Sequence, residues 1–76
     1  MNESIPQQVI GEAVNYIAHY GQHIAYLGQC QGQDYYRFLF PKDSLTGFPV
    51  VFVFDHQTNE VMTISDRNAL DIINSF

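Results

Sequence analysis

The chain of 76 residues has one cysteine, no tryptophan and only three lysine and arginine residues. With Cys30 alone, an internal disulfide is excluded, so a packed core must stabilise the chain. A chain of this size buries only about 60% of the surface that its unfolded form exposes, which leaves a small margin of stability. Six Phe and five Tyr supply much of the apolar area. We therefore expect one domain covering residues 1–76.

Positive charge is scarce and is not clustered. The three Lys and Arg residues, Arg37, Lys42 and Arg67, are far apart in the sequence, and eight Asp and Glu residues outnumber them, which gives a net charge of −5. Phosphate backbones and anionic lipid surfaces attract clusters of Lys and Arg. Nucleic acid and membranes are therefore not expected as partners. A basic protein partner is compatible with this charge but is not required by it.

Long apolar runs are also lacking. The longest has seven residues, at 48–54, whereas a membrane-spanning helix needs about 20. Residues 1–6 have neither the positive region nor the apolar region of a signal peptide. These absences predict a cytoplasmic protein with a reduced thiol.

The capping, turn and apolar patterns of the sequence predict the order α-β-β-β-β-α. A helix is expected from a capping box at Ser4 and Gln7 to a glycine stop at Gly21, with apolar residues three and four apart along it. Turn residues separate four expected strands, at 22–29, 35–40, 48–55 and 60–64. A last helix begins at Ser65 or Asp66 and carries one apolar face. The short connections predict an α+β fold, a four-stranded antiparallel meander with both helices on one face.

The strand at 48–55 is apolar on both faces, unlike a half-buried strand, which alternates. If Arg37 pairs with Val51, and Asp55 with Glu60, one face of the sheet is rich in Phe and the other remains apolar with one cation. We expect the helices to cover the Phe-rich face. The other face is then a contact surface, unless a long side chain or the C-terminal tail covers it. The candidate partner-binding residues on it are Tyr35, Arg37, Leu39, Val51 and Val53, with Arg37 supplying orientation.

No residue set predicts a reaction. His19 and His23 have the spacing of two metal ligands on a helix, but Gly21 between them is the expected helix end, so a structural role is favoured. Cys30 beside a histidine would need a cleft and an oxyanion hole to act as a nucleophile, and a buried thiol is the simpler interpretation. The Asp residues at 34, 43, 55 and 66 lie at expected turns and caps. We expect no catalytic residue, no metal and no cofactor.

From Val9 to Ile64 the order of helix and strands resembles the PepSY module. The motif positions of its terminal hairpin are occupied by Val53, Asp55, Thr58 and Val61. The chain departs from that family by having Asn59 in place of Gly, by the missing export signal and by the added helix at 66–75. The resemblance implies a non-catalytic binding or peptidase-inhibiting module and supplies no site.

The expected function is therefore a small non-catalytic protein-binding or regulatory module that forms a homodimer through the Val51 and Val53 face. Two alternatives remain open at this point. One is binding of a small ligand in a groove between helix and sheet. The other is an acidic inhibitor or immunity protein that neutralises a basic partner.

Overall fold

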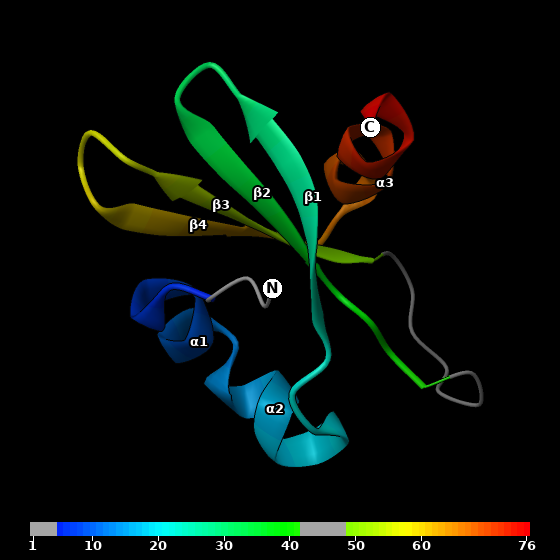
Figure 1. Ribbon diagram of the computed structural model, residues 1–76. Helices are drawn as coiled ribbons and strands as arrows, with labels where there is room; N and C mark the ends of the chain where they lie inside the picture. The colour runs from blue at the N-terminus through cyan, green and yellow to red at the C-terminus, as the bar shows by residue number, and fades with distance from the viewer. Residues whose placement is uncertain (1–4, 42–48) are drawn as a thin grey trace.

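The computed structural model describes residues 5–41 and 49–76, which form a single antiparallel sheet with helices on both sides (Figure 1). The strands follow one another in the order β1-β2-β3-β4, so the α+β meander expected from the sequence is confirmed. The elements, in chain order, are α1 (Gln7–Glu12), α2 (Val14–Tyr20), β1 (Ile24–Cys30), β2 (Gln33–Phe38), β3 (Val50–Asp55), β4 (Glu60–Ile64) and α3 (Arg67–Ser75).

The first expected helix is divided in two at Ala13. The Ala13 N–H is shared between the carbonyls of Val9 (3.0 Å) and Ile10 (3.1 Å), and the φ of Ala13 is −92°. Val9 and Ala13 are both fully buried, so the break lies where the helices contact the sheet. Pro6 is the N-cap, not the expected Ser4, which is outside the described residues. The predicted end is confirmed, because α2 stops at Gly21 with a φ of 88°.

The predicted register of the sheet is confirmed at both pairs that fixed it, Arg37 with Val51 and Asp55 with Glu60. The hairpin between β3 and β4 closes through Asn59, whose N–H donates to the Asp55 carbonyl (2.8 Å) and whose φ is 59°. Asparagine is one of the few residues other than glycine that adopt this left-handed conformation readily. Most of the expected loop at 41–47, together with residue 48, lies outside the described residues.

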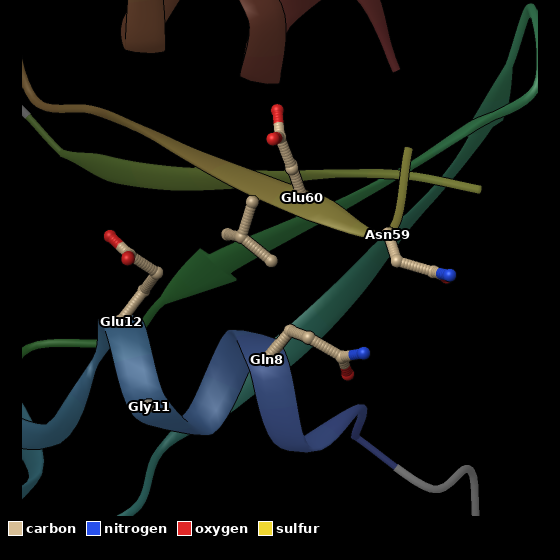
Figure 2. Close-up of a pocket in the computed structure, with 6 residues that line it drawn as sticks. Gln8, Gly11, Glu12, Asn59 and Glu60 are labelled. Atoms are coloured by element: carbon tan, nitrogen blue, oxygen red, sulfur yellow. The ribbon is translucent and has the colours of Figure 1, made fainter. Parts of the chain in front are cut away.

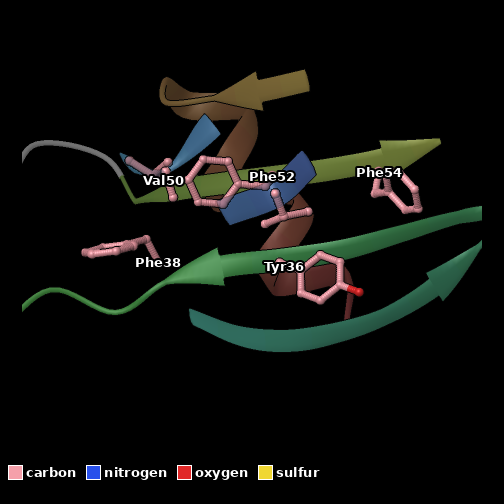
Figure 3. Packing of buried hydrophobic residues seen from close by; sticks show 7 residues of the cluster. Tyr36, Phe38, Val50, Phe52 and Phe54 are labelled. Carbon is pink, nitrogen blue, oxygen red and sulfur yellow. The ribbon is translucent and has the colours of Figure 1, made fainter. Parts of the chain in front are cut away.

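The Phe-rich face of the sheet forms the larger core, and α1 and α2 cover it. Figure 3 shows Tyr36 and Phe38 of β2 alongside Phe52 and Phe54 of β3. Val50 of β3, Val9 of α1 and Ala13 between the two helices complete this buried cluster. At about 25 cal/mol per Å² of apolar area, such a cluster supplies most of the free energy that stabilises so small a fold.

The expectation that both helices cover one face is wrong. Helix α3 lies on the opposite side of the sheet from α1 and α2 (Figure 1), and its Ala69 is buried against Val51 and Val53. Ile72 and Ile73 of α3 and Leu27 and Tyr35 of the sheet pack around this second cluster. The sheet is thus the middle layer of three, because both of its apolar faces require cover.

Candidate functional site

The predicted contact surface around Val51 and Val53 is not open. These side chains are 0% and 4% exposed, because α3 covers them. Tyr35 on the same face packs against Phe76, with the ring centroids 5.2 Å apart, and its hydroxyl donates to Gln33 Oε1. The expectation that this face of the sheet is open is therefore wrong, because the C-terminal helix of the same chain covers it.

The two other predicted contact residues, Arg37 and Leu39, differ in how far they are exposed. Arg37 is half-buried, and its Nε atom is buried without a hydrogen-bond partner among the described residues. Leu39 is 42% exposed and lines a shallow pocket of about 290 Å³ with His23, Phe40 and Pro41. Of the five candidates, Leu39 alone is exposed, so the structure does not bring them together as one accessible surface.

The residues weighed for metal binding or nucleophilic chemistry are also separated. His19 lies within α2, whereas His23 follows the helix end at Gly21, and its ring packs over that glycine. Cys30 is exposed, not buried as expected, and lines a pocket of about 320 Å³ with Tyr35 and Phe76. Among the described residues that line this pocket, none is a histidine.

A polar cluster joins β1, β2 and the loop that follows β3. Asp34 Oδ1 accepts a hydrogen bond from the Tyr26 hydroxyl (3.0 Å), and Asp34 Oδ2 lies 2.6 Å from His56 Nε2. The His56 ring also packs edge-on against Phe54, with centroids 4.9 Å apart. This pair is largely exposed on the histidine side, and exposed ion pairs contribute about 1 kcal/mol or less. The cluster fastens β1, β2 and the β3–β4 loop to one another.

The feature with free binding capacity is the outer edge of β4. Within the described residues β4 pairs only with β3, and all five of its residues pair in unbroken register. Every second residue of an antiparallel edge strand turns its N–H and C=O away from its neighbour, so β4 presents these groups outward. The Met62 side chain on this strand is 58% exposed, and the strand carries neither Pro nor Lys.

The other edge of the sheet is different. The pairing of β1 with β2 is interrupted between Tyr26 and Gly28, which is a β-bulge, and the φ of Gly28 is 154°. Phe76 packs directly over this glycine, since an added Cβ there would come within 2.8 Å of its ring. A bulge bends the strand and disturbs the spacing that a further strand would need. β1 is therefore a poor template for pairing, and β4 is a good one.

A groove runs between β4 and α1. Its volume is about 410 Å³, and its lining residues are Gln8, Gly11, Glu12, Asn59, Glu60 and Val61. Thr63 Oγ1 donates to Glu12 Oε1 (3.0 Å), which ties α1 to the strand at one end of the groove. Gly11 has no side chain and nothing within 4 Å of the position where a Cβ would lie, so the groove stays open beside it.

The two carboxylates of the groove lie on opposite sides of the edge strand. Figure 2 shows Glu12 projecting from α1 toward β4, whereas Glu60 projects from β4 away from α1. Neither carboxylate lies within ion-pair distance of a cationic side chain of the described residues. The contact of this kind found there joins His56 and Asp34. The edge of β4 thus combines unpaired backbone groups, an exposed thioether and negative charge on both sides.

No family model, curated protein or solved structure matches this chain. The described residues contain no helix with the length and apolar character needed to cross a bilayer. The fold class, α+β, does not by itself indicate a function. A function must therefore be inferred from the surface of the molecule.

Proposed function

We propose that the protein is a non-catalytic protein-binding module that adds an extended segment of a partner to its sheet along β4. The observation that carries this proposal is the contrast between the two sheet edges. β4 is regular, carries neither Pro nor Lys and exposes Met62, whereas β1 is bulged and overlaid by Phe76. Main-chain hydrogen bonds to an added strand provide affinity, and pockets beside the strand provide selectivity.

Binding of a small ligand in the groove is less well supported. Small-molecule sites are concave and mostly apolar, with a few convergent polar groups. The groove beside β4 is instead open and is lined chiefly by amide and carboxylate side chains such as Gln8, Glu12 and Asn59. An open groove beside a strand edge, lined by amide and carboxylate side chains, suits a peptide backbone better than a compact ligand.

The test selects nine-residue peptides from a random displayed library and maps the strongest binder by ¹⁵N amide shifts of the full chain. The expected result is that shifts and new amide protection concentrate on β4 and the facing side of α1. Met62→Lys places a charge on the edge and is expected to weaken binding about tenfold or more. Leu70→Lys, at an exposed apolar position on α3, is the matched control and leaves binding unchanged.

Two outcomes would contradict the proposal. The first is that no displayed peptide binds the folded chain. The second is that the selected peptides shift the amides of α3 or β1 while those of β4 stay in place. Either result would remove the strand edge as the binding surface.

A further inference from the structure

We infer that the segment recognised by β4 is a cationic strand, with Lys or Arg side chains on both of its faces. The inference rests on the proposed function and adds the chemistry of the partner. Side chains of a strand alternate between the two faces of the sheet. A strand added at β4 therefore directs one set of side chains toward α1 and the other set toward the opposite side.

The acidic residues match that alternation. On the α1 side, the Glu12 carboxylate is fixed beside β4 by the hydrogen bond from Thr63. On the other side, Glu60 projects from the first residue of the strand (Figure 2). An added strand lies about 4.8 Å from β4, a distance that a Lys or Arg side chain easily spans. Each face of the partner strand thus meets a carboxylate.

The charge of the chain favours this occupant over a second copy. Two copies paired through β4 would each contribute Glu12 and Glu60 to the same seam, and each carries a net charge of −5. The described residues offer two arginines to offset this, and Arg37 is half-buried beneath the face that α3 covers. A cationic segment instead pairs opposite charges at the seam, which raises both specificity and the rate of encounter.

The probe is a capped seven-residue peptide, Thr-Lys-Lys-Val-Lys-Lys-Thr, in which lysines 2 and 6 lie on one face of an extended strand and lysines 3 and 5 on the other. It is titrated into the full chain and followed by ¹⁵N amide shifts. Three peptides of equal length serve as controls. In one, glutamine replaces every lysine. In the other two, the lysines remain but alternate backbone nitrogens are methylated, in one phase or the other, so that in one of them the edge that would pair with β4 loses its N–H donors. The expected result is binding at β4 by the first peptide, at least about tenfold weaker binding by the glutamine peptide, and loss of binding by one methylated phase.

The protein variants are Glu12→Gln and Glu60→Gln. Glutamine at position 12 retains an oxygen that accepts from Thr63, so the groove keeps its shape while the charge is lost. Each variant is expected to weaken the lysine peptide about three- to tenfold and to leave the glutamine peptide unchanged. Asp71→Asn removes one charge from an exposed position on α3 and is expected to change neither. Raising the salt from 0.05 to 0.5 M is expected to reduce the difference between the peptides, since exposed charges are screened.

The outcomes separate this inference from the proposed function. Equal affinity of the lysine and glutamine peptides for β4 overturns the inference and supports strand addition itself. Binding of both methylated phases as strongly as the parent, without shifts in β4, shows attraction to the acidic surface only and overturns both. A dimer in sedimentation whose β4 amides are already protected before any peptide is added identifies a second copy as the occupant and also overturns the inference.

Discussion

Among single residues, Val51 is the one whose environment departs most from the open surface expected of it. It lies at the centre of the smaller core, fully buried between β3 and α3. Val51→Lys is therefore expected to lower the free energy of unfolding by at least about 3 kcal/mol, because a buried ammonium has no partner there. For a chain of this length the total is roughly 4 to 11 kcal/mol, so the substitution would remove a large share of the stability. Urea denaturation followed by circular dichroism measures the change.

Met62 provides the comparison for that variant. It pairs with Val53 on the same face of the sheet but is exposed at the edge. Met62→Lys is expected to change the free energy of unfolding by less than about 1 kcal/mol. Equal tolerance of both lysines would contradict the placement of α3 over this face, since Val51 would then have to be accessible to water.

Arg37 is a second residue with a measurable consequence. Its Nε atom is buried and has no hydrogen-bond partner among the described residues, so part of its hydration is lost without replacement. Arg37→Met keeps the long stem and removes the polar head, and we expect it to raise the free energy of unfolding by up to about 1 kcal/mol. Chemical denaturation detects this rise. A fall of more than 1 kcal/mol would instead show that the guanidinium has a stabilising partner.

Among the elements, α3 begins with a cap that the sequence predicted. Asp66 Oδ1 accepts from the Asn68 N–H (3.0 Å), which satisfies one of the free donors of the first turn. Asp66→Ala is expected to cost about 1 kcal/mol, and Asp66→Asn much less. Thermal and urea unfolding of the two variants measure the difference. If the helix were an unimportant appendage, both substitutions would leave the unfolding transition unchanged.

The elements that the sequence predicted well are those determined by neighbouring residues. Turn residues and the alternation of Phe and Val set the hairpins, and the positions of Asp55 and Glu60 set the register of β4. The side on which α3 packs could not be derived in the same way. Its stripe of Ala69, Ile72 and Ile73 fits either apolar face, and the choice between them depends on the coverage of the Phe-rich face by α1 and α2.

Only part of the candidate site could be predicted from the sequence. A meander of four strands places the fourth at an edge, and that much follows from the short connections. The groove depends on the contact of α1 with β4, where Glu12 and Thr63 are 51 residues apart. No local pattern reports such a contact, and the division of the first helix at Ala13 that accompanies it was likewise not predicted.

For the whole molecule, the three layers predict a gradient of protection from solvent. The central strands β2 and β3 are paired on both sides and covered on both faces, so their amides are expected to exchange slowest with deuterium. The outward amides of β4 are expected to exchange among the fastest of the sheet. Native-state hydrogen exchange followed by NMR measures both groups. Equal protection of β4 and β3 would show that the edge is already paired in solution.

The strand order also has a kinetic consequence. Each strand pairs with its neighbour in the chain, so the sheet assembles through local contacts, which fold quickly. The contact of α1 with β4 instead joins residues 51 positions apart, at a larger entropic cost. We therefore expect α1 to dock after the folding barrier has been crossed, so that variants at Val9 speed unfolding and leave the refolding rate nearly unchanged. Stopped-flow refolding of Val9→Ala measures this, and a slower refolding arm would place α1 in the nucleus instead.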